Sequence, residues 1–274
     1  MQGIISKERL LHLIEYGSSL NDTWALATIA TLCSCNEPYE IRKIYLYMIL
    51  KEQNADVKVT INKVWQVLEN DASQEGIKLV IDELFPVVTA RVTEITNKFR
   101  DALLKSGALC GLPKAINALT HLKEVTPSVL IDSSTIEPIA ASPKLFSQNV
   151  QRPRKGSDIE SFNNGIKHWN KVYDKVSTRV ANNLNSAYPD LWYFTLEHIY
   201  GPLLSYDEIL SATETSLIVI ASLVPQSVNP QLRGHLKGAL NVGCDKASVE
   251  QVRNISILCS EWCGIKWREE VCKL

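Results

Sequence analysis

A histidine at the edge of an apolar helical stripe is the residue in this chain best suited to chemistry. His235 lies in the segment 231–240, where apolar residues recur at three- and four-residue intervals: Leu232, Leu236, Ala239 and Leu240. At the edge of such a stripe the imidazole can face a cleft between subunits. An imidazole with a pKa near ~6.5 exchanges a proton at physiological pH, as lactone opening or decarboxylation to an enol requires. The alternative interpretation is a hydrogen-bonded histidine at a helix edge.

Thiols are frequent, but their spacing does not indicate a metal or redox pair. The seven cysteines stand at positions 33, 35, 110, 244, 259, 263 and 272. Neither Cys33/Cys35 nor Cys259/Cys263 has Cys-x-x-Cys spacing, and no second Cys/His pair lies at zinc-ligand spacing. The N-terminus does not resemble a secretory signal, so an odd number of cysteines favours free thiols in a reducing compartment. We therefore expect buried structural thiols and no metal site.

The overall charge and hydropathy exclude two classes of partner. The 274 residues include 29 Lys and Arg and 30 Asp and Glu, so the net charge is −1 and no overall field attracts nucleic acid. The one dense basic cluster, 152–155, stands among Pro and Ser and is interpreted as part of a solvated linker. No apolar stretch approaches the roughly 18–20 residues that a membrane span needs. The sequence thus predicts neither nucleic-acid binding nor a membrane span.

The last three residues, Cys272, Lys273 and Leu274, fit a peroxisomal import signal. That signal combines a small residue, a basic residue and Leu at the C-terminus. Its receptor captures a free carboxylate, one cation and one apolar side chain in a groove. We expect a protein of the peroxisomal matrix that is recognised by the import receptor, with the cytosol as the alternative.

Helical periodicity predicts an all-α fold. The expected helices of the first half are 9–16, 23–32, 39–51, 59–68, 77–104 (ended or kinked at Pro86) and 113–122. Those of the second half are 158–185, 190–200, 211–224, 231–240 and 248–262. Ser211 and Ser248 are each followed three residues later by Glu or Gln, which predicts a capping box at both helix starts. Between the halves, residues 124–157 are rich in Pro and Ser and read as an irregular linker.

The two halves repeat one another. Residues 29–32 match residues 220–223 at an offset of 191, and the same offset superposes Arg42 on Arg233. Both halves also close on a Cys-Gly pair, at 110–111 and 263–264. The sequence therefore predicts two diverged units, 1–123 and 158–274, on either side of the linker.

The second unit resembles a carboxymuconolactone decarboxylase domain. The resemblance rests on Tyr188-Pro-Asp-Leu191, Ile199-Tyr-Gly201, Glu214-Thr-Ser-Leu217 and above all Gln231-Leu-Arg-Gly-His-Leu-Lys-Gly-Ala-Leu-Asn-Val-Gly243. The first unit adds Cys110-Gly-Leu-Pro-Lys-Ala-Ile-Asn-Ala118, which is similar to the Gly-x-Pro helix that closes the family's domain. This resemblance implies an all-helical fold that assembles into rings, such as trimers of two-unit chains, and an activity that needs no cofactor.

The resemblance implies one of two chemistries. One branch of the family decarboxylates a carboxy-lactone; the alkylhydroperoxidase-D-like branch reduces disulfides with a Cys-x-x-Cys pair, a Glu and a His. Here the Glu position holds Ser216 and the cysteine positions hold Val228 and Gln231, so that only His235 remains. Disulfide exchange needs a thiolate, and peroxidase activity of this type is therefore not expected. In the first unit Ile44 occupies the histidine position, which leaves at most one active centre per chain.

Two residues could assist His235. Ser216, in the position of the family's Glu, could accept or donate a hydrogen bond to the imidazole. Arg233 could hold a substrate carboxylate in a bidentate pair. However, Arg42 keeps the same position in the unit without the histidine, which favours a structural salt bridge. Arg233 also projects about 200° around the helix from His235, so the two need not share a pocket.

Three further features have a structural and a functional interpretation. Glu214 could act as an acid, but its place in a capping box explains it. Asn241 precedes Gly243, where both suit a helix C-terminus. The aromatic residues could line an apolar ligand pocket, although core or subunit interface is the commoner role: Trp169, Tyr173, Tyr188, Trp192, Tyr193 and Phe194.

The functional hypothesis is a peroxisomal lyase that acts on a small or acyl organic acid or lactone, with His235 as proton shuttle. A non-catalytic protein, retained for assembly or ligand binding, is the main alternative. A thiol oxidoreductase that uses Cys259 or Cys263 is the third.

Overall fold

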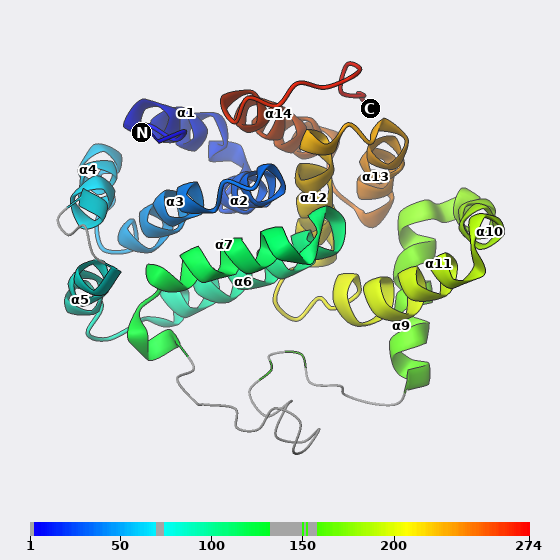
Figure 1. Cartoon of the computed structure of the whole chain (residues 1–274), viewed down its shortest axis with the longest axis horizontal. Coiled ribbons are helices and arrows are strands. Elements are labelled where there is room, and N and C mark those ends of the chain that lie inside the picture. Colours follow the sequence, from blue (N-terminus) through cyan, green and yellow to red (C-terminus); the bar gives the residue numbers. More distant parts are fainter. Residues whose placement is uncertain (1–2, 70–73, 132–149, 151, 153–157) are drawn as a thin grey trace.

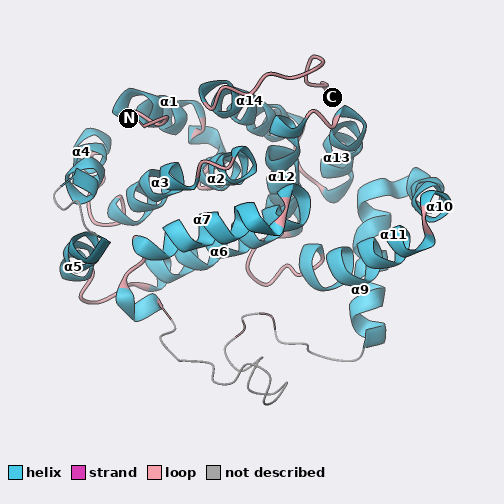
Figure 2. Ribbon diagram, viewed as in Figure 1, coloured by secondary structure: helices cyan, strands magenta, loops and turns pink. Residues whose placement is uncertain are grey.

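The computed structural model describes residues 3–69, 74–131, 150, 152 and 158–274, and all regular structure in these residues is helical (Figure 2). The N-terminal half contains α1 (Lys7–Tyr16), α2 (Thr23–Cys35), α3 (Pro38–Leu50), α4 (Val57–Glu69), α5 (Gln74–Leu84), α6 (Ala90–Cys110) and α7 (Leu112–Glu124). The C-terminal half contains α9 (Asp158–Tyr173), α10 (Ser177–Ala187), α11 (Pro189–Phe194), the π-helical segment η4 (Thr195–Leu204), α12 (Ala212–Leu223), α13 (Asn229–Val242) and α14 (Lys246–Trp262). The predicted all-α fold is confirmed.

Local sequence signals explain most helix boundaries. Pro86 falls between α5 and α6 and separates them, as expected from its missing N–H. The capping box of α12 is present, because Ser211 accepts from the Glu214 N–H while Glu214 accepts from the Ser211 N–H. The capping box predicted at Ser248 is wrong. Asp245 caps α14 instead, and its carboxylate accepts from the Ser248 N–H at 2.8 Å, so the helix begins one turn earlier.

The core is built around α2 and α12, which pack against each other at the centre of the molecule (Figure 1). Every residue from Trp24 to Ser34 is buried, as is every residue from Thr215 to Leu223. A helix that is apolar all round belongs in a core. Two buried hydroxyls of this pair form hydrogen bonds: Thr31 donates to the Ala221 carbonyl at 3.2 Å, and Ser222 donates to the Ser106 hydroxyl at 3.1 Å.

Helices from both halves surround this central pair in a similar way. The helices α6 and α14 each pack against both α2 and α12 (Figure 1). Pro38 begins α3 and Asn229 begins α13, which keeps the offset of 191 residues found in the sequence. The helices α4 and α5 lie between α3 and α6 and have no counterpart between α13 and α14. This arrangement supports two related units, whose boundaries at 1–123 and 158–274 stay a prediction.

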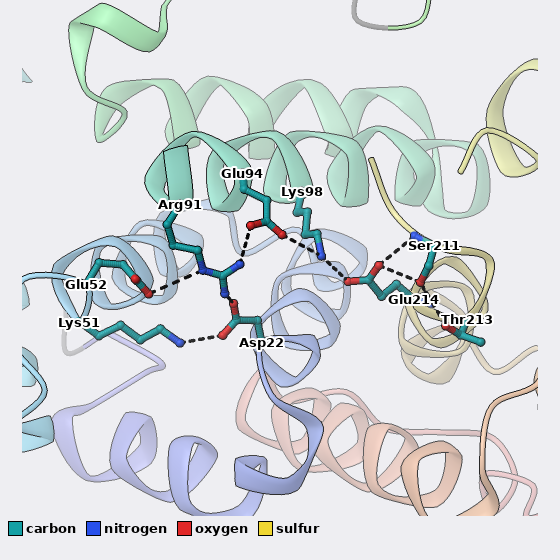
Figure 3. Close-up of polar contacts among 9 residues, drawn as sticks. All are labelled: Asp22, Lys51, Glu52, Arg91, Glu94, Lys98, Ser211, Thr213 and Glu214. Atoms are coloured by element: carbon teal, nitrogen blue, oxygen red, sulfur yellow. Dashed lines mark hydrogen bonds and ion pairs between the residues drawn. The ribbon is translucent and has the colours of Figure 1, made fainter. Parts of the chain in front are cut away.

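A chain of ion pairs joins the two halves (Figure 3). Lys98 on α6 lies 2.8 Å from Glu214 on α12 and 3.4 Å from Glu94. The chain then continues through Arg91 and Asp22 to Lys51 and Glu52. Glu214 therefore has a structural role, as helix cap and ion-pair partner, which agrees with the structural interpretation of its sequence position.

The helices α9, α10 and α11 with η4 form a lobe beside the core (Figure 1). Gly165 of α9 and Gly201 of η4 allow these segments to approach closely, since a Cβ built on Gly165 would lie 2.9 Å from the Gly201 backbone. Gly238 does the same between α13 and α9, where a Cβ would lie 2.7 Å from Val172 Cγ1. These contacts fix α9 and η4 against α13.

The predicted linker lies largely outside the described residues, which omit 132–149, 151 and 153–157. Within its described part, α7 extends to Glu124 and a short 3₁₀ turn spans Ser128–Leu130. Of the basic cluster 152–155 only Arg152 is among the described residues, and it is not solvated as expected. It forms an ion pair with buried Asp101, and its guanidinium lies 4.5 Å from the centroid of the Tyr206 ring.

Candidate active site

A cavity of about 910 Å³ lies between the lobe and α13. Its walls come from α9, the short 3₁₀ helix η3 (Asp174–Val176), α10, η4 and α13, with Ala108 and Leu109 added from the end of α6. Apolar and aromatic side chains make up much of the lining, as is usual for pockets that hold small organic molecules. The π-helical segment η4 contributes Ile199 and Tyr200 to the wall, and π-helical turns are frequent at functional sites.

His235 lies in this cavity, in a hydrogen-bonded chain with two tyrosines. Its Nε2 is 3.4 Å from the Tyr173 hydroxyl, and Tyr200 donates to the Tyr173 oxygen at 3.3 Å. Because that oxygen accepts from Tyr200, the Tyr173 proton is available to Nε2, and a neutral imidazole then carries its proton on Nδ1. The Tyr173–His235 bond is long, as catalytic hydrogen bonds often are without a ligand.

Burial determines the protonation states of His235, Tyr173 and Tyr200. Burial, and to a smaller extent the charge on His168, lower the pKa of His235 to about 4. Burial raises the pKa of Tyr173 and, most strongly, that of Tyr200. At neutral pH the cavity therefore holds a neutral imidazole and two protonated phenols.

The rim of the cavity is positively charged. Four exposed cationic side chains contribute to its lining: Lys175, Arg179, Arg233 and Lys237. The lining contains one carboxylate, that of Asp174. Asp174 has a φ of +46°, a left-handed conformation that non-glycine residues rarely adopt and that concentrates at functional sites. An excess of cations over apolar walls favours an organic anion as the ligand.

Arg233 lies in the wall of the His235 cavity, whereas Ser216 does not. Arg233 and His235 line the same cavity, although their side chains point about 200° apart on α13. In the described part of the chain no ion pair involves Arg233, whereas Arg42 pairs with Glu124 at 3.2 Å. Ser216 is buried on α12 and donates to the Ala212 carbonyl at 3.0 Å, so the described partner of the imidazole is Tyr173.

The other candidate residues divide between the cavity and the surface. Trp169 and Tyr173 line the cavity, with their ring centroids 4.2 Å apart. On α11 and just before it, Tyr188, Tyr193 and Phe194 are exposed and lie outside the lining. Gly243 ends α13 in the left-handed conformation as expected, but Asn241 instead donates to the Val172 carbonyl at 2.9 Å and lines the cavity.

Lys105 is an unusual residue that the sequence did not single out. It is fully buried on α6, where its amine lies 2.7 Å from Thr215 Oγ1, 2.8 Å from the Tyr206 carbonyl and 3.2 Å from Asp101. Burial lowers its pKa to about 7. Its positive charge in turn contributes, after burial, to lowering the pKa of His168 to about 4. Nothing in the local sequence distinguishes this lysine from Lys98, the partly exposed lysine of the same helix.

Among the described residues, no cluster of three or more His, Cys, Asp or Glu side chains could hold a metal ion. The cysteines are free thiols, and the predicted burial holds for Cys33, Cys259 and Cys272. The other four are half-buried.

The predicted targeting residues are docked on the protein's own surface. Arg253 is buried and donates to the carbonyls of Val271 and Cys272, both at 2.6 Å. The Cys272 N–H donates to Asn229 at 3.0 Å, and the Leu274 N–H donates to Glu250 at 3.3 Å. Of these three residues, only Lys273 has a side chain that is mostly exposed.

Fold and cavity together define an all-helical chain with a cation-rimmed pocket around a neutral histidine. Comparison with known proteins adds its family. The chain is 48% identical to peroxisomal protein 2 of Saccharomyces cerevisiae over an alignment of 285 residues that covers the whole of both proteins. It is 40% identical to peroxisomal protein 2 of Schizosaccharomyces pombe over 174 residues, 64% of this chain and 74% of that protein. The chain belongs to this peroxisomal protein 2 family.

Family membership confirms the predicted peroxisomal localisation. Among the described helices, none is both long and apolar enough to cross a membrane. No model of a protein family matches the chain, and no solved structure matches it. The resemblance to the carboxymuconolactone decarboxylase family therefore stays a prediction.

Proposed function

We propose that this chain is a cofactor-independent lyase of the carboxymuconolactone decarboxylase type, which acts in the peroxisome on a small organic acid or lactone. The observation that carries the proposal is the cavity in which His235, neutral and in contact with Tyr173, lies within a rim of cations. Nothing in the comparisons names a substrate, so the substrate class rests on the chemistry of the cavity.

The cavity suits a molecule with an apolar body and a carboxylate. Trp169, Ile199 and Leu204 supply apolar wall, and Arg233 offers a guanidinium that can hold a carboxylate by two parallel hydrogen bonds. Lys175, Arg179 and Lys237 add positive charge, which also attracts the anion from solution. A cavity of about 910 Å³ accommodates an aromatic or acyl acid rather than a macromolecule.

His235 can move a proton once such a ligand is present. A carboxylate close to an imidazole favours its charged form, so ligand binding raises the pKa of His235 from its low value. Loss of CO₂ leaves the electrons of the broken C–C bond on the adjacent carbon as an enolate. The imidazolium then delivers its proton to that carbon, while Tyr173 supports the ring by its hydrogen bond.

The repeat supports a single centre in each chain. Ile44 stands 191 residues before His235, on α3, and is fully buried in the core of the first half. The first unit (1–123) would then serve to position the second (158–274), with α2 and α12 as their shared core.

A non-catalytic ligand-binding protein is the second candidate. It is favoured by the low pKa of His235, because an imidazole with a pKa of about 4 is a weak base in the empty cavity. The two candidates share the binding site and differ in turnover alone.

A thermal-shift screen tests the proposed site. The purified protein is melted with lactones, keto acids, aromatic acids and acyl thioesters, and any ligand that shifts the melt is incubated with the protein and assayed for product. A ligand at 100 times its Kd should add about 2.7 kcal/mol to the free energy of unfolding. We expect the shift to weaken in His235→Ala and Arg233→Gln and to persist in Arg42→Gln, the matched arginine outside the cavity. Equal shifts in all four proteins would contradict a site at His235.

A further inference from the structure

Four thiols meet at the C-terminal end of α2, although they are far apart in the sequence. Cys33 and Cys35 lie on α2 itself, Cys110 is the last residue of α6, and Cys263 follows the last residue of α14. Because α6 and α14 both pack against α2, the ends of these helices bring the cysteines together. The sulfurs of Cys33 and Cys110 are 3.8 Å apart, and Cys35 lies in hydrogen-bonding contact with Cys263.

The Cys33/Cys110 pair is one small movement from a disulfide. A separation of 3.8 Å is a contact distance between two sulfurs, and a disulfide bond requires about 2.05 Å. Rotation of one side chain can supply most of that difference. Cys110 is also the terminal residue of its helix and precedes Gly111, whose φ of +100° ends α6, so its side chain is less constrained than one in mid-helix.

The surroundings of the pair favour a thiolate on Cys110. The Cys33 thiol, the Ser34 hydroxyl and the charge on Lys114 together lower the pKa of Cys110 to about 7, against the opposing effect of burial. The Lys114 amine is held in place by a hydrogen bond of 2.6 Å to the Ser34 carbonyl. The same contact with Cys110, together with burial, raises the pKa of Cys33. The two sulfurs therefore share their protons unequally.

The two thiols also differ in exposure. Cys33 is 1% exposed, whereas Cys110 is half-buried and part of this residue contacts solvent. A reactive thiolate with access, next to a buried partner thiol, is the arrangement of a redox-sensitive dithiol.

We propose that Cys110 and Cys33 form a peroxide-reactive dithiol, a site separate from the His235 cavity. The Cys110 thiolate attacks one oxygen of a small hydroperoxide and the O–O bond breaks. The second oxygen leaves as an alcohol or water after it takes up a proton, and Cys110 becomes a sulfenic acid. Cys33 then attacks the Cys110 sulfur, the S–O bond breaks, and the hydroxyl leaves as water with the Cys33 proton.

The electrons in this sequence balance. The two thiols lose two electrons and two protons, the hydroperoxide is reduced, and the product is a Cys33–Cys110 disulfide. An external dithiol restores the pair by thiol–disulfide exchange. The thiol-oxidoreductase interpretation of the sequence assigned this chemistry to Cys259 or Cys263. In the structure Cys259 is fully buried, and burial raises its pKa.

Peptide mapping after oxidation tests the proposal. The reduced full-length protein receives one equivalent of hydrogen peroxide, and remaining thiols are then alkylated and located by mass spectrometry without reduction. We expect a Cys33–Cys110 cross-linked peptide, formed at least ten times faster than any oxidation of Cys244. Cys244 is the matched control, because it is also half-buried but burial and Asp245 raise its pKa to about 11.

Two variants separate the steps. In Cys33→Ser the reaction should stop at a sulfenic acid on Cys110, which dimedone traps; in Cys110→Ser the Cys33 thiol should stay reduced. The mapping of the wild-type protein decides the proposal if either variant fails to fold. An alkylatable Cys110 after all peroxide is consumed, a first disulfide between other cysteines, or equal oxidation of Cys244 would overturn it.

Discussion

The hydroxyl of Tyr173 lies 3.4 Å from Nε2 of His235, and Tyr200 donates to the same hydroxyl. This relationship joins α9, η4 and α13 in one cavity and orients the imidazole, which burial keeps neutral. The proposed proton transfer by His235 is derived from it, and the proposed recognition of an organic anion is derived from the cations at the rim.

The neutral state of His235 makes stability depend on pH. The pKa of His235 falls from 6.5 to about 4 on folding, so the unfolded chain binds more protons between these values. The contribution of His235 to the free energy of unfolding, about 3 kcal/mol, is therefore fully present above pH 6.5. It is lost as the pH falls toward 4. Urea denaturation of wild type and His235→Gln at several pH values measures the effect. Parallel pH profiles would contradict a neutral imidazole with a lowered pKa.

Close helix packing shapes the cavity, and Gly238 tests this. An added methyl group would meet Val172 Cγ1 at 2.7 Å and the Val172 carbonyl at 3.1 Å, so Gly238→Ala should cost about 1–3 kcal/mol of stability. Gly234, on the same helix, is the matched control, because its nearest contact would be Tyr173 Cε1 at 3.8 Å. We expect Gly234→Ala to be neutral or slightly stabilising. Equal melting temperatures for the two variants would contradict the packing described.

Lys105 should be far more important to stability than an exposed lysine in an ion pair. Lys105→Met leaves buried Asp101, Thr215 and the Tyr206 carbonyl without this donor, and we expect a loss of about 3 kcal/mol. Lys51→Met removes the partly exposed pair with Asp22 and should cost less than about 1 kcal/mol. Chemical denaturation of both variants compares them. A loss of stability that is no greater for Lys105→Met than for Lys51→Met would contradict the burial of the Lys105 amine.

Docking of the C-terminal residues should compete with import recognition. If the import receptor reads Cys272, Lys273 and Leu274, the tail must first leave Arg253, which binds two of its carbonyls. Arg253→Met should therefore tighten binding to the receptor's peptide-binding domain about tenfold, equivalent to about 1.4 kcal/mol. Fluorescence anisotropy measures this affinity, with Lys246→Met, an exposed residue of the same helix, as control. Unchanged or weaker binding by Arg253→Met would exclude the competition.

The sequence predicts the helices well because their signals are local. Apolar periodicity, the break at Pro86 and the Ser211–Glu214 capping box all act within a few residues. The misplaced start of α14 has the same origin, since Asp245 and Ser248 are both competent caps and only the backbone decides between them.

Long-range contacts account for what the sequence did not predict. The ends of α2, α6 and α14 bring together cysteines that have no common spacing, and the lobe brings Tyr173 to His235 from 62 residues away. The burial of Lys105 likewise depends on η4 and α12. His235 could be predicted as a candidate because the chemistry of an imidazole follows from the residue type alone. Its partner Tyr173 could not be predicted, because their contact depends on the fold.

The fate of the transferred proton tests the central claim most directly. Wild type and His235→Gln are incubated in D₂O with the organic acid or lactone that gives the largest thermal shift, and product is followed by NMR. The proposed mechanism predicts one deuterium at the carbon that loses CO₂, and product formation that is about 10²–10⁴ times slower in the variant. Equal rates in the two proteins, or a ligand that binds in the cavity but is never consumed, would contradict catalysis by His235.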